Sequence, residues 1–306
     1  MQSLLPLGIH KLLFQKLLTG LRRYKEFSAA QCAARQAVGT AADRPDVFNH
    51  LLRARHPSSA GPLFSDRELV CESSLLIIAG SDTTSTCLAA TLFYLLHSPE
   101  ALRRATTEVR AAFGELEDVR GGPALNACVF LRACIDEALR LSPPVGGLMP
   151  REVLPGGFAV DGLVFPEGTE VGAPHYALHH KPEHYPDPFA FKPERWLEEK
   201  AGAAEKANEK AAAHTMQGPR VAFCAWSIGP RNCVGKAMAY LELMLVLARL
   251  LWEFEMRIAP GSTLGEGGVG LGRDREREGE YQLWDTFASR SQGPMVEFRV
   301  RVEGGG

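Results

Sequence analysis

The sequence lacks any pair of cysteines with CxxC spacing, and its seven cysteines are an odd number. Small secreted proteins that depend on disulfides usually carry an even set of cysteines at regular spacings. Four of the seven lie in apolar stretches with a helical pattern: Cys71, Cys87, Cys128 and Cys134. The pattern argues against a disulfide framework and predicts reduced, buried thiols, as in an intracellular protein.

An excess of charge of either sign is also missing, because the formal net charge is only -2. No basic face interleaved with aromatic residues stands out along the chain, and no internal repeat is visible. A nucleic-acid-binding surface needs clustered positive charge. We therefore expect no nucleic-acid partner.

Long uninterrupted apolar runs are missing as well, since no stretch reaches the roughly 20 apolar residues of a spanning helix. In the N-terminal segment MQSLLPLGIHKLLFQKLLTGLRRY, Pro6, Lys11 and Lys16 interrupt the apolar residues, and no small-residue cleavage site is visible. We interpret this segment as an amphipathic helix and not as a targeting signal. An integral membrane protein is not expected.

What the sequence does have is apolar material: 45% of its 306 residues are hydrophobic, enough for one large core or two domains. Residues 1–140 have a helical pattern throughout. The longest helix, predicted at about 66–97, begins where Ser65 and Glu68 have capping-box spacing, and it ends at a Ser-Pro pair. It is apolar on nearly all sides, which is typical of a helix through the centre of a large domain.

The character of the chain changes after residue 140. Residues 141–196 predict small sheets and an irregular segment, with a hairpin signal at Asp161-Gly162. Residues 197–219 form a charged, low-complexity insert for which we expect no chemistry. Residues 220–306 contain a cysteine loop, a long apolar helix and C-terminal strands.

The last of these strands shows a clean alternation of apolar and charged residues over 296–303. This alternation predicts a half-buried strand, which we expect to pair through a turn at 291–294 with residues 281–287. The fold class is therefore mainly α with small antiparallel β-sheets.

The segment WSIGPRNCVG, residues 226–235, holds Cys233 between Arg231 and the start of an apolar helix. Nearby positive charge and a helix N-terminus both stabilise a thiolate. The loop alone leaves three interpretations open: a structural thiol, a nucleophile with a histidine partner, or a metal ligand. Free cysteines are mostly buried, which favours the first. The nearest upstream histidine, His214, lies in the insert, which weakens the second.

A second motif, AGSDTT, lies inside the long predicted helix. Ala79 and Gly80 are small residues in mid-helix, where glycine costs about 1 kcal/mol relative to alanine. Asp82 and Thr83 follow, and an acid and a hydroxyl beside a local opening could deliver protons to a bound molecule. Taken alone, the motif favours the simpler interpretation of a packing glycine with incidental polar neighbours.

The third motif is EALR, in which Glu137 and Arg140 are three residues apart on one helix face. Such pairs are usually solvated and contribute little. Here the neighbours are apolar, which predicts partial burial and a further partner, for which Arg195 in KPERW is the candidate.

Four histidines have spacings that would suit zinc on a helix: His175, His179, His180 and His184. The surrounding prolines at 174, 182, 186 and 188 make a continuous helix improbable there, so no zinc site is expected.

The order of these motifs is more specific than any one of them. AGSDTT, EALR, FKPERW and WSIGPRNCVG, with these separations, resemble the cytochrome P-450 haem-thiolate monooxygenases, closest to those of filamentous fungi, over roughly residues 65–300. The resemblance implies a cytochrome P-450 fold, of which this chain would be the C-terminal portion.

By this resemblance Cys233 is the axial thiolate ligand of haem iron, held by the amides of a loop that includes Gly229 and Gly235. A thiolate ligand favours O–O cleavage. Arg231 and Arg151 match positions that pair with haem propionates, a role that suits the arginine fork. Trp226 stands where the family normally has phenylalanine, and the resemblance implies that it keeps the stacking role while its N–H changes the hydrogen bonding.

The resemblance also assigns the other motifs. Asp82 and Thr83 match the acid–alcohol pair that relays protons to bound dioxygen, and Ala79 and Gly80 make room beside the haem. A structural triad on the proximal side comprises Glu137, Arg140 and Arg195. The substrate side would be lined by residues 144–148, residues 284–288, Ile77 and Ile78.

The family also has a long N-terminal half, including a membrane-anchor helix, that has no counterpart in this sequence. Members usually lie on the cytosolic face of the endoplasmic reticulum membrane, and without the anchor we expect a soluble or peripheral intracellular chain.

Our leading hypothesis is a monooxygenase that oxidises a small apolar molecule with dioxygen and electrons from NADPH, supplied by a reductase. The reductase would dock on the Cys233 face, where Arg220, Arg231 and Lys236 offer positive charge. The alternative is a non-catalytic haem-binding remnant, from a truncated paralogue or an incomplete gene model. A cysteine hydrolase would need a base near Cys233, and the sequence offers none.

Overall fold

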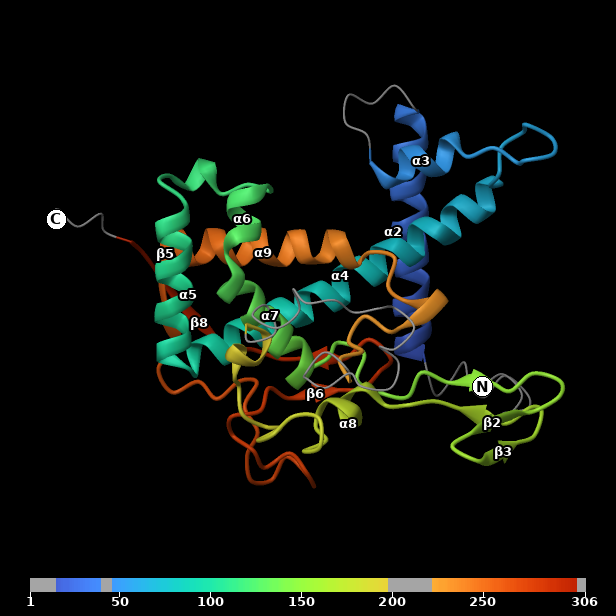
Figure 1. Ribbon diagram of the computed structural model, residues 1–306. Coiled ribbons are helices and arrows are strands. Elements are labelled where there is room, and N and C mark those ends of the chain that lie inside the picture. Colours follow the sequence, from blue (N-terminus) through green and yellow to red (C-terminus); the bar gives the residue numbers. More distant parts are fainter. Residues whose placement is uncertain (1–14, 40–45, 198–221, 302–306) are drawn as a thin grey trace, which may run out of the picture. The chain divides into compact units, whose positions relative to one another are not determined.

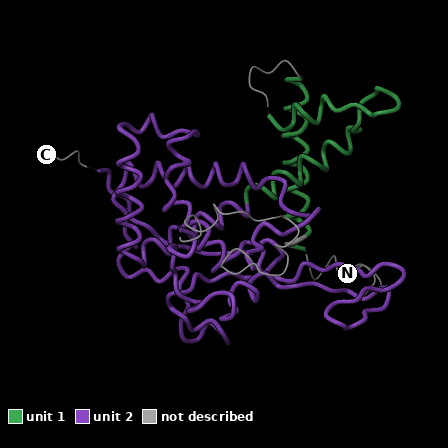
Figure 2. Tube along the Cα trace, viewed as in Figure 1, with its two compact units in different colours: residues 1–81 green, residues 82–306 purple. Residues whose placement is uncertain are grey.

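The computed structural model describes residues 15–39, 46–197 and 222–301. The chain forms two compact units, residues 1–81 and residues 82–306, shown in separate colours in Figure 2. Each unit is described by itself below.

The sequence predicts one partial domain over residues 1–306. The boundary between the two compact units falls inside the long helix, between Ser81 and Asp82. Three predicted features lie outside the described residues. They are most of the N-terminal amphipathic segment, the low-complexity insert from residue 198 onward, and Arg220.

In the first unit, α2 (Gln15–Val38) and α3 (Val47–Arg53) accompany the first half of α4 (Asp66–Leu96). The capping box at the start of α4 forms as predicted. The Ser65 N–H donates to a Glu68 carboxylate oxygen at 2.8 Å, and the Glu68 N–H donates back to Ser65 Oγ at 3.3 Å. The buried core of this unit comprises Cys32, Phe48 and Leu69.

The second unit contains the rest of α4 and most of the other elements (Figure 1). Its further α-helices are α5 (Pro99–Ala112), α6 (Pro123–Ala127), α7 (Val129–Leu141), α8 (His175–His179) and α9 (Lys236–Glu253). Short 3-10 turns are η2 (Leu116–Asp118), η3 (Pro193–Trp196) and η5 (Gly229–Arg231).

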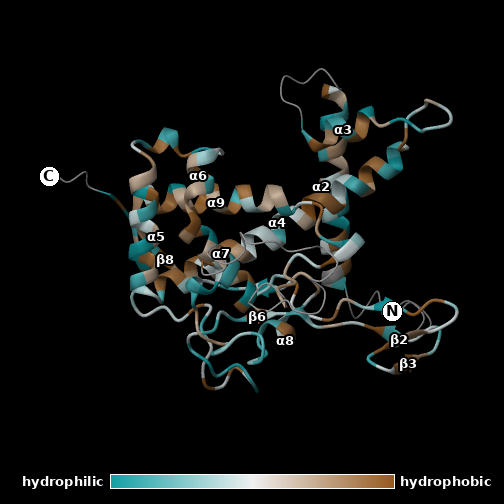
Figure 3. Cartoon of the chain, viewed as in Figure 1, coloured by the Kyte–Doolittle hydropathy of each residue, from teal (hydrophilic) through white to brown (hydrophobic). Residues whose placement is uncertain are grey.

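The core of the second unit is built around α9, whose hydrophobic residues are visible along the helix in Figure 3. Leu243, Leu247 and Leu251 recur every fourth residue and are fully buried. They belong to one cluster with Val109 of α5 and Ile135 of α7. Each such side chain contributes about 1.5–3 kcal/mol on burial. This cluster supports both α7 and the loop that precedes α9.

Four two-stranded antiparallel sheets complete the unit. β1 (Arg151–Glu152) pairs with β4 (Glu170–Val171), and β2 (Phe158–Val160) pairs with β3 (Leu163–Phe165). The turn between β2 and β3 is the predicted Asp-Gly pair, with φ of 48° at Asp161 and 82° at Gly162. Positive φ at both central residues is the geometry that matches strand twist in a tight hairpin.

The C-terminal strand pairs differently from the prediction. β8 (Val296–Val300) pairs with β5 (Phe254–Ile258), and residues 281–287 contribute β6 (Leu283–Trp284) to a separate sheet with β7 (Arg290–Ser291). The local alternation specified a strand but not its partner, because β5 follows directly on α9 and is far away in sequence.

The predicted half-burial of this strand is also wrong: Phe298 is 48% exposed and Val300 is 62% exposed. A two-stranded sheet leaves much of its surface uncovered, even where the ring of Phe298 meets Phe254 with centroids 5.5 Å apart.

Among the described helices, only α4 has the length and composition of a membrane span, with a mean hydropathy of 1.3 over its most apolar window. Core helices of soluble proteins also meet this criterion. From the sequence we expected no membrane-spanning helix, because no uninterrupted apolar run is long enough. That criterion is stricter than mean hydropathy over a window. These properties of α4 therefore do not place the chain in or outside a membrane.

Candidate active site

The cysteine loop is a closed turn in front of α9. The Cys233 N–H donates to the Trp226 carbonyl at 2.8 Å, and the Asn232 N–H donates to the Gly229 carbonyl at 3.1 Å. Gly229 has φ of 70°, which is strained for residues with a Cβ. Gly235 is the N-cap of α9, and the helix begins at Lys236, three residues beyond the exposed Cys233. The helix N-terminus behind Cys233 forms as the sequence predicts, and the exposure of the thiol is a finding of the structure.

A cavity of about 190 Å³ lies beside this thiol, within the second unit. The loop and α9 form one side of it, and the α4 residues that follow the unit boundary also line it. It is lined by Thr83, Thr84, Cys87, Leu139, Pro144, Val145, Met149, His175, Ala225, Trp226, Ser227, Arg231, Cys233, Ala239 and Leu243. The wall is mainly apolar, with two thiols, of Cys87 and Cys233, and one guanidinium, of Arg231.

These residues fit a flat apolar cofactor with a soft metal and carboxylate groups. Sulfur is a soft metal ligand, and the guanidinium of Arg231 is a strong carboxylate partner. His175 adds an unexpected feature, because it is 6% exposed and its Nδ1 is buried without a hydrogen-bond partner in the part of the chain the structure describes. Buried polar atoms of this kind usually mark a missing ligand or water. Sequence reasoning treated His175 only as a rejected zinc ligand.

The structure separates the predicted acid from the predicted alcohol. Thr83 lines the cavity that contains Cys233, whereas Asp82 lines a neighbouring open hollow with Ser85, Thr86 and residues 286–291. Consecutive helical residues point about 100° apart, so both cannot face the same way.

Further predicted residues do not line the cavity: Ile77, Ile78, Ala79, Gly80, Arg151, Gly229 and Gly235. Ala79 and Gly80 lie in α4 but belong to the first unit, and an added Cβ at Gly80 would meet nothing within 4 Å. Arg151 lies in β1 and is exposed, and its guanidinium donates to the Pro150 carbonyl at 2.8 Å.

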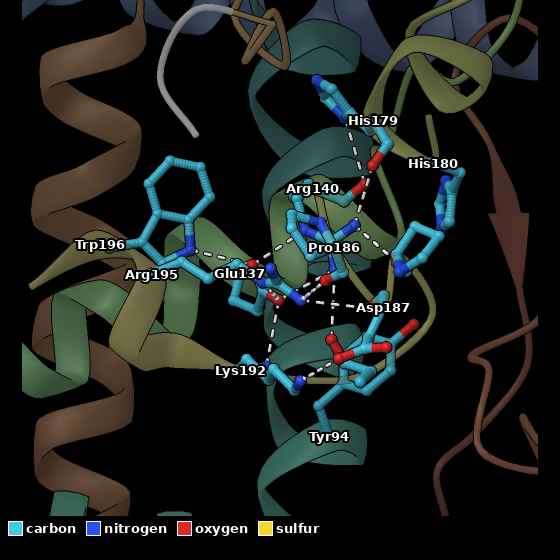
Figure 4. A network of polar contacts seen from close by, with 12 residues as sticks. Tyr94, Glu137, Arg140, His179, His180, Pro186, Asp187, Lys192, Arg195 and Trp196 are labelled. Atoms are coloured by element: carbon cyan, nitrogen blue, oxygen red, sulfur yellow. Dashed lines mark hydrogen bonds and ion pairs between the residues drawn. The ribbon is translucent and has the colours of Figure 1, made fainter. Parts of the chain in front are cut away.

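The structure brings Glu137, Arg140 and Arg195 together in a buried cluster (Figure 4). Arg140 donates two bonds of 2.9 Å to the Glu137 carboxylate, and Arg195 Nε donates a third at 3.2 Å. Both Glu137 and Arg140 are fully buried. The remaining Arg140 donors reach the carbonyls of His179 at 2.9 Å and Pro188 at 2.7 Å. A buried carboxylate between two guanidiniums ties α7 to the irregular segment.

Two members of this network escaped the sequence analysis. Trp196 donates its indole N–H to Glu137 at 3.0 Å, and only its adjacency to Arg195 in the PERW turn could have indicated this. His179 donates from Nδ1 to the Arg140 carbonyl at 3.1 Å and accepts the Cys224 N–H on Nε2 at 3.0 Å.

Burial, together with the smaller effect of the neighbouring His175, lowers the pKa of His179 to about 3, so the ring is neutral at pH 7. A neutral ring has one donor and one acceptor nitrogen, which is what these two bonds require. His179 thus links the charged cluster to the start of the cysteine loop.

Known proteins are similar to this chain in sequence and in fold. A family model described as cytochrome P-450 matches residues 11–265. A cytochrome P-450 monooxygenase of Gibberella zeae is 45% identical over 85% of this chain and 57% of its own length. The cytochrome P-450 monooxygenase AKT7 of Alternaria alternata is 42% identical over 95% of this chain and 55% of its own length. The chain therefore spans about half the length of these curated relatives.

A third relative, the cytochrome P-450 monooxygenase apf8 of Gibberella fujikuroi, is 38% identical over 98% of this chain and 78% of its own length. Among solved structures, a crystal structure of a cytochrome P-450 (CYP102L1) superposes with a TM-score of 0.68 at 21% identity, covering 92% of this chain and 56% of that one. This similarity shows the fold. With the motif order, the cavity beside Cys233 and these matches in agreement, the chain belongs to the cytochrome P-450 family.

Proposed function

We propose that the chain binds haem in the cavity beside Cys233 and serves a monooxygenase reaction on a small apolar molecule. The observation that carries this proposal is the placement of Cys233, Arg231 and Trp226 on the wall of one apolar cavity. The names of the relatives support the reaction class. When bound, haem supplies the activation of dioxygen, which a thiolate ligand favours.

Each side chain has a task that follows from its chemistry. The Cys233 thiolate is the iron ligand, and the N-terminus of α9 behind it stabilises its negative charge. Arg231, for which the structure records no ion pair within the described residues, is available to bind a propionate. The apolar wall excludes water from the space that the cofactor and the substrate share.

Proton delivery is proposed to pass along α4. Thr83 lines the cavity, while Asp82 lines the separate open hollow. Asp82 would therefore take protons from solvent and Thr83 would present them at the cavity. The predicted role of Ala79 and Gly80, leaving room for the cofactor, has no part in this proposal, because neither residue lines the cavity.

The remaining assignments are part of the same proposal. Glu137, Arg140 and Arg195 hold the proximal side together and take no part in turnover. Electrons from NADPH would arrive through a reductase docked near Arg231 and Lys236, both of which are exposed. The proposal also places the chain's work at the cytosolic face of the endoplasmic reticulum membrane, where members of the family usually lie.

Carbon monoxide spectroscopy tests the proposal. The chain is produced with a haem supply, reduced, and exposed to carbon monoxide. We expect the red-shifted Soret band of a thiolate-ligated haem. Cys233→Ser removes the ligand and should abolish this band. Cys71→Ser is the matched control, because Cys71 is the other exposed cysteine.

Two outcomes contradict the assignment: no red-shifted band in the wild-type chain, or a band that survives Cys233→Ser. A normal band without oxidation of any apolar substrate, with a reductase and NADPH present, would instead support a haem-binding protein without turnover.

A further inference from the structure

Trp226 holds the cysteine loop through its main chain and its side chain at once. Its carbonyl accepts the Cys233 N–H at 2.8 Å, and its indole N–H donates to the Tyr240 hydroxyl at 2.7 Å. Tyr240 lies in α9, 14 residues further along the chain. The residue that closes the loop is therefore also tied to the helix behind it.

The hydrogen-bond chain continues into α7. The Tyr240 hydroxyl donates to Asp136 Oδ1 at 2.6 Å, and both residues are at most 9% exposed. Burial raises the pKa of Tyr240, and the charge of Asp136 raises it further, so the phenol keeps its proton. Its one proton goes to Asp136, which leaves only a lone pair for the Trp226 N–H. The direction of every bond in the chain is fixed.

Arg132 completes the arrangement beside Tyr240 and Asp136, with its side chain 41% exposed. Its guanidinium lies 3.2 Å from the centroid of the Tyr240 ring and 3.3 Å from Asp136 Oδ2. The guanidinium pairs with the carboxylate and covers one face of the phenol. The Tyr240 ring also meets the Trp226 indole, with centroids 4.7 Å apart and planes inclined at 49°. The indole is thus fixed by packing and by one hydrogen bond.

We propose that Tyr240 and Asp136 are positioning residues for Cys233, and that they act through the indole N–H of Trp226. The hydrogen bond fixes the Trp226 ring against the cavity, and the Trp226 carbonyl then fixes the Cys233 amide. Opening this bond releases the loop and lets the sulfur leave its place beside the cavity. This inference rests on the proposed function for its spectroscopic consequence, but its geometric consequence applies to the protein without cofactor.

Two variants each remove the hydrogen bond between Trp226 and Tyr240, one at its donor and one at its acceptor. Trp226→Phe keeps an aromatic ring and loses the N–H donor, and Tyr240→Phe keeps its ring and loses the hydroxyl. Each removes one hydrogen bond from the loop, which corresponds to about a 2- to 10-fold change in the population of the open loop. Because both act on one bond, the double variant should show the effect of Tyr240→Phe alone.

The first experiment uses the protein without haem, in a Cys71→Ser background that leaves Cys233 as the exposed thiol among the seven cysteines. We measure the rate of Cys233 alkylation by iodoacetamide. Trp226→Phe and Tyr240→Phe should each change this rate about 2- to 10-fold. The second experiment measures the share of thiolate-type Soret band in the reduced, carbon monoxide-treated protein, which should fall in both variants.

Tyr94→Phe is the matched control, because the buried Tyr94 hydroxyl bonds to Ser142 at 2.7 Å, and neither residue lines the cavity beside Cys233. It should lower stability without changing either readout. Unchanged alkylation and an unchanged band in both loop variants, or equal changes in Tyr94→Phe, would overturn the inference. Absence of the band from the wild-type protein would overturn the proposed function instead, and the alkylation rates would still decide this inference.

Discussion

Replacing Glu137 by glutamine tests whether the buried charged cluster holds the second unit together. The carboxylate of Glu137 accepts from Arg140, Arg195, the Lys192 N–H and the Trp196 indole. Glutamine has nearly the same shape but no charge, and its amide group is a donor that faces donors. Glu137→Gln therefore leaves two guanidiniums without their counter-charge, one of them fully buried.

The magnitude follows from the burial. Breaking a buried ion pair by removing one partner costs about 3–5 kcal/mol, because the other charge stays buried without compensation. Whole domains are stable by only about 5–15 kcal/mol. With a urea m-value of about 3 kcal/mol per molar, the midpoint should fall by about 1–1.7 M.

The assay is urea unfolding followed by far-ultraviolet circular dichroism and tryptophan fluorescence, and Glu100→Gln is the matched control. Glu100 and Arg103 form a pair with the same three-residue spacing on α5, but both side chains are largely exposed. The control should unfold like the wild type. If Glu137→Gln and Glu100→Gln shift the urea midpoint equally, the cluster does not carry the stability we assign to it.

Two further predictions concern pH and the core. Because burial lowers the pKa of His179 from 6.5 to about 3, this histidine is protonated at a higher pH in the unfolded chain than in the folded chain. The contribution of the neutral His179 ring to the free energy of unfolding is complete above pH 6.5. It decreases by about 2–3 kcal/mol between pH 6.5 and pH 4.5. His179→Asn should flatten the pH dependence of urea unfolding, and an unchanged slope would contradict this. Leu247→Ala should cost about 2–5 kcal/mol in thermal unfolding. Leu241→Ala, on the exposed side of α9, should change little, and equal losses would contradict the assigned core.

Features set by neighbouring residues were predictable from the sequence. The capping box at Ser65 and the Asp161-Gly162 hairpin both form as predicted. The order of four motifs also indicated the family correctly, because each motif combines residues whose chemistry is needed at fixed spacings. In these cases the interactions that determine the local structure join residues only a few positions apart, or the motif itself indicates the family.

Features that depend on distant partners were not predictable. The alternation over 296–303 predicted a strand, but residues 254–258 and not residues 281–287 became its partner. Trp196 joined the buried cluster without a distinct sequence signal. Asp82 and Thr83 were grouped as neighbours in sequence, yet helix geometry turns them toward different hollows. Each outcome depends on which surfaces meet after packing.

The sequence by itself determined the family and the mainly helical class, and it singled out Cys233 as the proposed iron ligand. Local spacing carries that information because caps, turns and ligand loops are short-range structures. Only the tertiary structure decided that His179 joins the charged cluster to the cysteine loop, and that Trp226 meets Tyr240 and Asp136. These contacts join residues 14 to 104 positions apart, and only the packing of α7 and α9 in a common core brings them within hydrogen-bonding distance.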